Sequence, residues 1–306
     1  MKEEFYLDRL LSGGAFNFNR LKIDGIDNEP VYDCFGEHMS VEETCLFSQE
    51  IDSGQEYMEL VQKSLLDSLE NKREMPIVRF ADGEYAFYVK SMKCNGLYQQ
   101  AESVAAIRRA LPYHIEMLRR LVKHGWLAPL IHKGNIAVPK RGFWAFIRRS
   151  RSEGSALQFL EFLAANEIPL AADNYIPFYV LYAFLSSPAF AEIVDGKHLC
   201  ILNSTCNIEA CREWFSRRGS APKLTFVEIP DSFVATRWQD MRQDILARVP
   251  KDCDLCLVGA GIGSLLVCVD LASTFTVPAI DAGHVLNMMN AREDKSNGAR
   301  LYTIWK

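Results

Sequence analysis

The apolar positions of the chain repeat with a helical period in two long stretches. Between Gly54 and Asn71 they recur at steps of three and four residues, which predicts an amphipathic helix. The same spacing over residues 102–124 predicts a second, longer helix whose arginines face outward. Pro112 lies inside that second stretch, so we expect either a kink there or two shorter helices.

Short apolar runs, separated by further helical stretches, predict the strands of a sheet. These runs lie at residues 76–80, 136–139, 197–202, 224–230, 255–258 and 279–281. Because strands alternate with helices, the fold class that we predict is α/β, with a Rossmann-like, mostly parallel sheet flanked by helices. Residues 1–52 show no clean period, so we expect an irregular N-terminal extension followed by one main domain at residues 53–306.

The composition narrows the class of protein. Of the 306 residues 49% are hydrophobic and 24% are charged, which is typical of a globular chain with a sizeable core. The net charge of −5 argues against a protein that coats nucleic acid. Nine cysteines are scattered along the chain, and this indicates reduced, buried thiols rather than a disulfide framework. Cys253 and Cys256 form a C-x-x-C pair, which we interpret as structural because no second pair follows at zinc spacing.

Two carboxylates follow the strand at residues 76–80. Asp82 and Glu84 stand one residue apart, with Gly83 between them to allow a close backbone approach or a positive φ. Ligands of open α/β sheets bind beyond the carboxyl ends of the strands, and hard oxygen ligands suit Mg²⁺ or Mn²⁺ on a diphosphate. An ordinary Asp-Gly turn explains the same residues without any ligand.

Two segments resemble a known family. Residues 77–84, which include Arg79, Phe80, Asp82, Gly83 and Glu84, resemble the RFGDGE signature of the GT-D glycosyltransferases. Residues 254–284, which end in Asp-Ala-Gly-His, resemble the closing strand, glycine turn, helix, strand and D-x-G-H pattern of that family. The resemblance covers roughly residues 55–290 and includes the run at 135–139, where the family has a short strand ending in proline.

The resemblance implies a metal-dependent glycosyltransferase of the hexosyltransferase class. The expected donor is a UDP-linked nucleotide sugar, and the expected acceptor is a glycan, glycolipid or glycoprotein. Mn²⁺ or Mg²⁺ would be the cofactor, with Asp82 and Glu84 at the metal. Arg79 would orient the carboxylates, contact phosphate or form a structural ion pair. No secretory signal or membrane-spanning run is visible, so we expect a cytoplasmic protein that reaches membranes only through its acceptor.

Further candidate residues lie at other predicted strand ends. Asp281 and His284 follow the last strand and are candidates for acid, base or metal-ligand roles, as is Asp173 for the base. Asn203 begins a polar run that caps the next helix or meets a phosphate. The basic residues of segment 140–151 either grip the diphosphate or acceptor, or form a solvated helix face.

A glycine turn supports a competing interpretation. Gly259, Gly261 and Gly263 follow a strand and precede a helix, as in a dinucleotide fingerprint, although the last glycine comes one position early. They either approach a nucleotide sugar or bind NAD in an oxidoreductase. A non-catalytic nucleotide-binding protein that assembles into a larger machine is a third hypothesis, and the sequence leaves a homo-oligomer open.

Overall fold

The fold is built on a parallel sheet that the alternation of strands and helices predicted. The structure is a computed structural model that describes residues 31–32, 38–39, 54–92, 97–131, 133–136, 154–171 and 173–292. Its main sheet has six strands, all parallel, in the order β4-β3-β8-β7-β5-β6. The strands are β3 (Met75–Phe80), β4 (Trp126–Pro129), β5 (His198–Asn203), β6 (Lys223–Glu228), β7 (Leu255–Gly259) and β8 (Pro278–Asp281). The predicted α/β, Rossmann-like fold is therefore confirmed.

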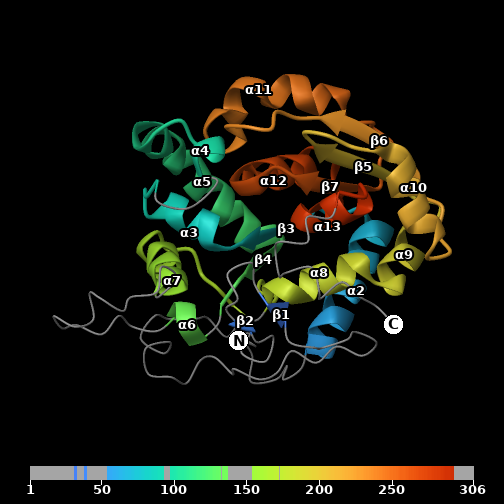
Figure 1. Ribbon diagram of the computed structural model, residues 1–306, viewed down its shortest axis with the longest axis horizontal. Helices are drawn as coiled ribbons and strands as arrows, with labels where there is room; N and C mark the ends of the chain where they lie inside the picture. The colour runs from blue at the N-terminus through green and yellow to red at the C-terminus, as the bar shows by residue number, and fades with distance from the viewer. Residues whose placement is uncertain are drawn as a thin grey trace.

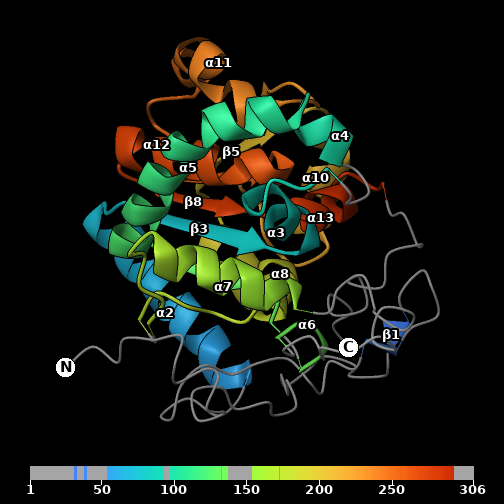
Figure 2. The same cartoon turned by 90° about the vertical axis from the view of Figure 1, so that its left-hand side faces the viewer.

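Helices cover both faces of this sheet (Figures 1 and 2). One face carries α5 (Val104–His124), α11 (Val234–Arg248) and α12 (Ser264–Phe275). The other face carries α2 (Gly54–Asn71), α8 (Phe178–Ser186), α9 (Pro188–Val194), α10 (Ile208–Ser216) and α13 (Gly283–Met289). The remaining elements are α3 (Asp82–Tyr88), α4 (Leu97–Gln100), α6 (Lys133–Ile136), α7 (Ser155–Ala165) and the 3-10 turn η3 (Gly261–Gly263).

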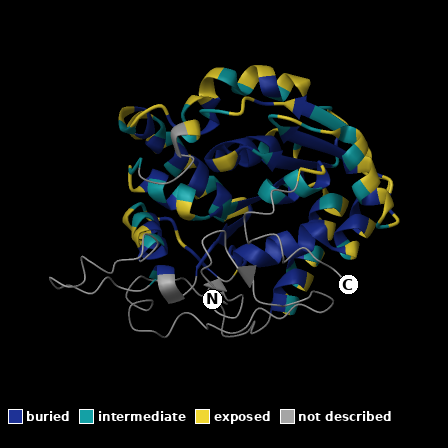
Figure 3. Ribbon diagram, viewed as in Figure 1, coloured by how far each residue is buried: buried dark blue, intermediate teal, exposed yellow. Residues whose placement is uncertain are grey.

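The core lies between the sheet and these two helical layers. The central strands β7 and β8, and helix α8 along its whole length, are buried almost throughout, whereas α10 and α11 expose their outer sides (Figure 3). A strand that is buried on both faces needs apolar residues on both faces. The sequences of β5 and β7 are therefore nearly continuous apolar runs. None of the helices among the described residues has the length and apolar character needed to cross a bilayer.

Strand order decides which loops meet at the carboxyl edge. β3 lies between β4 and β8, and β8 is followed by β7, so the chain after β3 meets the chain after β8 and after β7. The connection from β5 leads outward to β6, whereas that from β7 leads inward to β8. Ligand sites of open α/β sheets lie where connections diverge in this way. The connections diverge between β5 and β7, and the end of β8 lies on the other side of β7.

Several sequence predictions about single elements are corrected. The helix over residues 102–124 is one continuous helix, α5, with Pro112 inside it, so two shorter helices do not form. The strand beside β3 is β4, which the sequence did not predict, and Ile136 belongs to helix α6 instead of a strand. Residues 137–139 and the basic segment 140–151 lie outside the described residues.

The predicted N-terminal extension is described only at two short strands. β1 (Val31–Tyr32) and β2 (His38–Met39) pair antiparallel with each other. The rest of residues 1–52, and the boundary placed at residue 53, stay a prediction.

Candidate functional site

Helix α3 begins immediately beyond β3 and carries both predicted carboxylates. Ala81 is the N-cap residue, and Asp82 and Glu84 are the first and third residues of the helix. The Glu84 carboxylate turns back, and its Oε2 accepts a hydrogen bond from the Ala81 backbone N–H at 2.8 Å. This is one half of a capping box, and acidic side chains in a first helical turn are also stabilised by the helix dipole. The Asp-Gly pair therefore starts a helix and does not form a turn.

This helical start separates the two carboxylates. Residues two apart on a helix do not face each other, and accordingly Asp82 is exposed whereas Glu84 is partly buried. Gly83 has no positive φ, and a Cβ atom on it would meet no atom within 4 Å. The expectation of a positive φ at Gly83 is therefore wrong, and its close approach to a ligand stays a prediction.

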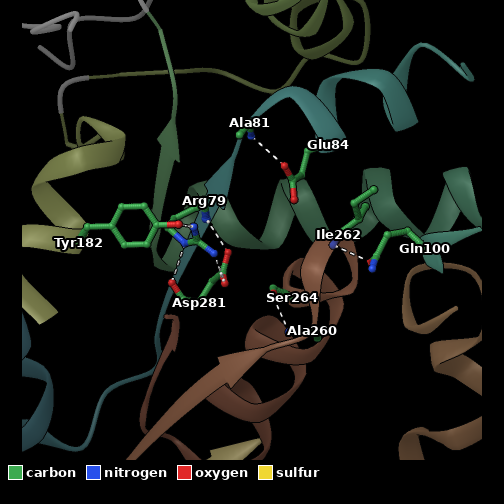
Figure 4. Close-up of polar contacts among 9 residues, drawn as sticks. All are labelled: Arg79, Ala81, Glu84, Gln100, Tyr182, Ala260, Ile262, Ser264 and Asp281. Carbon is green, nitrogen blue, oxygen red and sulfur yellow. Dashed lines mark hydrogen bonds and ion pairs between the residues drawn. The ribbon is translucent and has the colours of Figure 1, made fainter. Parts of the chain in front are cut away.

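Arg79, on β3, is held by Asp281 at the end of β8 (Figure 4). Its Nη2 lies 2.8 Å from Asp281 Oδ1 and its Nε donates to the Asp281 carbonyl oxygen at 3.0 Å. Both side chains are nearly inaccessible, with 11% and 3% of their surfaces exposed. Burial lowers the pKa of Arg79, but the charge and hydrogen bond of Asp281, together with the nearby Tyr182 and Glu84, raise it overall. Of the three roles foreseen for Arg79, the structural ion pair is the one observed.

The same contacts engage Asp281. Both carboxylate oxygens are engaged, since Oδ2 accepts from the Arg79 backbone N–H at 3.3 Å while Oδ1 pairs with the guanidinium. Asp281 therefore holds both the backbone and the side chain of Arg79. The contacts observed for Asp281 are structural, and its predicted acid–base role stays a prediction.

Tyr182 completes this cluster, and the sequence did not single it out. Its hydroxyl accepts hydrogen bonds from Arg79 Nη1 and from the backbone N–H of His284. Its ring lies under the guanidinium, 4.7 Å from Arg79 Cζ, and the ring of Phe178 lies at 5.3 Å. Burial raises the pKa of Tyr182 to about 12. The helical spacing of Phe178 and Tyr182 was visible in the sequence, but their position beside Arg79 was not.

Gly283 makes room for Arg79 at the start of α13. Its φ is +42°, and a Cβ atom at this position would lie 1.8 Å from Arg79 Nη2. A side chain is excluded there by both backbone conformation and space. The glycine of the D-x-G-H segment therefore allows β8 and α13 to close around the arginine.

Glu84 faces the same site from the opposite side. Figure 4 shows its side chain descending from α3 between Arg79 and Ile262. Burial raises the pKa of Glu84 to about 7, and the Asp281 charge acts in the same direction. The Ala81 N–H and the Arg79 charge oppose this rise. The Glu84 carboxylate therefore takes up a proton at a higher pH than an ordinary glutamate does.

His284 and Asn203 lie at strand ends, as predicted, but β7 separates their strands β8 and β5. His284 is in the first turn of α13, directly after β8, and its side chain is partly buried. Asn203 ends β5, where it is the register partner of Gly259 on β7. Its Oδ1 accepts from the Ser204 backbone N–H at 2.9 Å, and the cap of α10 is Asn207.

The glycine turn is packed against protein atoms. Gly261 has φ +53°, and a Cβ atom there would lie 2.5 Å from Gln100 Oε1. The backbone N–H of Ile262 donates to that same Oε1 at 3.1 Å, and that of Ala260 donates to Ser264 Oγ at 3.2 Å (Figure 4). In a dinucleotide fingerprint such N–H groups face the pyrophosphate. Their occupation by side chains argues against NAD binding.

The two other glycines also make contacts within the chain. A Cβ atom on Gly263 would lie 2.5 Å from Val234 Cγ1, and one on Gly259 would lie 3.0 Å from Leu286 Cδ1. Both positions are therefore tight because helices α11 and α13 approach them. The predicted ligand contacts of Gly259, Gly261 and Gly263 have no support in this packing.

Two further candidates lie away from the site. Phe80 is fully buried and stacks on Phe159 with ring centroids 5.0 Å apart, so it belongs to the core instead of a nucleotide site. Asp173 comes two residues before Tyr175, which bridges in parallel to Leu127 near the amino end of β4. Asp173 is consequently at the wrong end of the sheet for an acceptor base. His114, on α5, is buried as well.

The acidic side chains of the site could bind a metal ion only together with a ligand. Within the described ranges, no group of three or more His, Cys, Asp or Glu side chains is arranged to hold a metal ion. Asp82 offers an exposed carboxylate at the carboxyl edge of the sheet. Mg²⁺ is commonly bound by one or two carboxylates together with substrate phosphates. The residues therefore fit an ion shared with a diphosphate, and not a site made by the protein alone.

Comparison with known proteins identifies part of this architecture. Residues 154–289 match the family model of the GT-D fold-like domain. Searches of curated proteins and of solved structures found no match. The matched range begins with α7 and includes strands β5 to β8, and the acidic segment at residues 77–84 precedes it.

The sheet joins the acidic segment to the matched range. β3 pairs with β8, and Arg79 binds Asp281, so residues 79–84 lie against the end of the last strand in that range. The resemblance noted at both ends of the sequence thus corresponds to a single site in space. Residues 154–289, which are less than half of the chain, are therefore similar to a GT-D fold-like domain.

Proposed function

We propose that the protein is a metal-dependent glycosyltransferase that moves a sugar from a UDP-linked donor to a glycan or glycoconjugate. One observation carries this proposal. The acidic start of α3 directly follows β3, whose Arg79 binds Asp281 at the end of β8, and strands β5 to β8 of this sheet lie in the range that matches the GT-D fold-like domain. Carboxylates at that edge meet ligand in open α/β folds.

Asp82 is the residue that we assign to the metal and the donor diphosphate. It is exposed at the first position of α3, just beyond β3. A bound Mn²⁺ or Mg²⁺ would neutralise charge on the leaving diphosphate. Without that ion, the Asp82 carboxylate would repel the diphosphate, so its value to binding depends on the metal.

Glu84 is the residue that we assign to the acceptor proton. Its carboxyl group points from α3 into the site, whereas Asp281 is already occupied by Arg79 (Figure 4). A carboxylate within hydrogen-bond reach of an acceptor hydroxyl can take its proton as the new bond forms. His284, in the first turn of α13, is the second candidate for this role.

Arg79, Asp281 and Tyr182 form the support of the site in this proposal. Their contacts join β3, β8 and α8 and hold the backbone of His284. They therefore fix where α3 and α13 begin relative to each other. A site needs such rigid support to hold its reacting groups in place.

Turnover of sugar nucleotides tests the proposal. UDP release from a panel of UDP-sugars is measured with Mn²⁺ for the wild type, Asp82→Asn and Glu84→Gln. We expect release for at least one donor, with a loss of about 10²-fold or more in each variant. Glutamine keeps the side-chain oxygen that accepts from Ala81, so Glu84→Gln should fold normally.

Asp240→Asn is the matched control, because it removes an exposed carboxylate from α11 at no cost to the site. It should release UDP at the wild-type rate. Full activity of Asp82→Asn would remove the metal assignment, and full activity of Glu84→Gln would transfer the proton role to His284. Release of no UDP from any donor would contradict the proposed activity.

A further inference from the structure

Two cysteines lie in contact in the connection between β5 and α10. Cys206 and Cys211 have their Sγ atoms 3.8 Å apart. Asn207 is the N-cap of α10, so Cys206 directly precedes the cap and Cys211 is the fourth residue of the helix. Side chains at these two positions pack on each other in the hydrophobic staple of many helices. The contact is therefore fixed by the geometry of the helix start.

The two thiols differ in access and surroundings. Cys206 is partly exposed, whereas Cys211 is buried. Cys211 Sγ lies 3.6 Å from Asn290 Oδ1, and Arg292 binds the hydroxyl of Thr205 beside Cys206. A cation and a helix N-terminus both stabilise a thiolate. The hydrogen bond from Cys211, and then the Arg292 charge, lower the pKa of Cys206.

We propose that Cys206 and Cys211 form a reversible disulfide when the protein meets a low-molecular-weight disulfide such as oxidised glutathione. Cys206 is the attacking residue because it is the accessible member of the pair. Cys211 is the resolving residue because it lies against Cys206 and away from solvent. This pair is independent of the transfer chemistry proposed above.

The exchange balances in two steps. The Cys206 thiolate attacks one sulfur of glutathione disulfide and releases one glutathione thiolate, which leaves a mixed disulfide on Cys206. Cys211 then loses its proton and attacks the Cys206 sulfur, which releases the second glutathione. Two electrons and two protons pass from the protein to glutathione disulfide. The Sγ atoms need to approach from 3.8 Å to about 2.05 Å.

A second pair in the chain lacks these features. Cys253 and Cys256 have Sγ atoms 4.0 Å apart, but both side chains are buried. A thiol that a soluble disulfide cannot reach does not exchange at a useful rate. Cys253 and Cys256 therefore serve as an internal control, because they are close together but not accessible to a soluble disulfide.

Peptide mapping after equilibration in glutathione buffers tests the proposal. The folded protein is equilibrated, quenched in acid, unfolded, alkylated and digested with trypsin, which cleaves after Lys197 and Arg212. The resulting peptide contains Cys200, Cys206 and Cys211. We expect its alkylated thiols to fall from three to one as glutathione disulfide increases. The closed peptide should be about 2 Da lighter than the reduced peptide.

Two variants separate the steps. Cys211→Ser should trap one glutathione on Cys206, and Cys206→Ser should acquire none on Cys211. Persistence of three alkylated thiols in every buffer would overturn the proposal. So would a glutathione adduct on Cys200, or a pair at Cys253 and Cys256 that closes before this one does.

Discussion

Arg79 belongs to the segment that resembles a family signature, but its contacts are structural. Its guanidinium is buried between Asp281, Tyr182 and Phe178, and the pairs join strands that are far apart in sequence. Breaking a buried ion pair by removing one partner is costly, because the other charge stays in a medium of low dielectric constant. We therefore expect a substitution in this pair to change the free energy of unfolding more directly than the catalytic rate.

Asp281→Asn should lower the free energy of unfolding by about 3–5 kcal/mol. The variant keeps the shape of the side chain but leaves the Arg79 charge without its counter-charge. Urea unfolding at neutral pH measures the loss. Asp82→Asn is the control, since its exposed carboxylate should change stability by less than about 1 kcal/mol. Equal losses in the two variants would mean that the Arg79 pair contributes nothing to stability.

Two glycines of the site give a matched pair of substitutions. Gly283→Ala places a Cβ atom against Arg79 at a positive φ, so we expect a loss of about 2 kcal/mol or more. Gly83→Ala lies in the first turn of α3 with open space around it, so we expect a change of less than about 1 kcal/mol. Thermal unfolding of both variants distinguishes them, and a tolerated alanine at residue 283 would contradict the described packing.

At the scale of elements, the sequence pattern predicted the long helices and five of the six strands of the main sheet, but it missed β4. The predicted helix at residues 54–71 coincides with α2, because its apolar face repeats over five turns. The run at residues 136–139 and the true strand β4 are both short, apolar and end in proline. Such short runs do not differ in pattern between strand and helix, so the sequence predicted a strand at Ile136, which belongs to α6, and missed β4.

Helix α5 shows that a buried histidine can connect elements without serving catalysis. His114 Nε2 lies 2.7 Å from the Ala235 carbonyl oxygen on α11, and Nδ1 lies 3.2 Å from the Tyr88 hydroxyl on α3. A carbonyl only accepts, so Nε2 carries the proton and Nδ1 accepts from Tyr88. Burial lowers the pKa of His114 to about 4.

This lowered pKa predicts acid sensitivity. Between about pH 6.5 and 4 the unfolded chain protonates this histidine while the folded protein does not, so stability falls as pH falls. His114→Gln removes that term. The difference in unfolding free energy between wild type and variant should therefore shrink by about 1–2 kcal/mol between pH 7 and pH 5. A difference that stays constant over this range would show that His114 is not held neutral.

At the scale of the whole molecule, the sequence predicted which residues share one edge of the sheet, but not which strands pair there. Asp82, Glu84 and His284 follow strands, so their shared edge followed from a parallel sheet. The pairing of β3 with β8 and the contact of Arg79 with Tyr182 depend on strand order, which one sequence does not reveal. Strand pairing over this separation is set by packing of the whole chain.

The glycine turn is a second feature that required the whole molecule. Its spacing resembles a nucleotide fingerprint, but Gln100 and Ser264 occupy its N–H groups. Gln100 lies far from the turn in sequence and reaches it through α4. The local pattern alone could not distinguish packing against protein from contact with phosphate.

The most direct test of the account is calorimetric titration of UDP into the purified protein, first with Mn²⁺ and then with EDTA. The account predicts binding that requires the metal and that weakens at least about tenfold in Asp82→Asn, but not in Asp240→Asn. Equal UDP affinity in Mn²⁺ and EDTA, or equal affinity in the two variants, would contradict the claim that Asp82 and a metal hold the diphosphate at the end of β3.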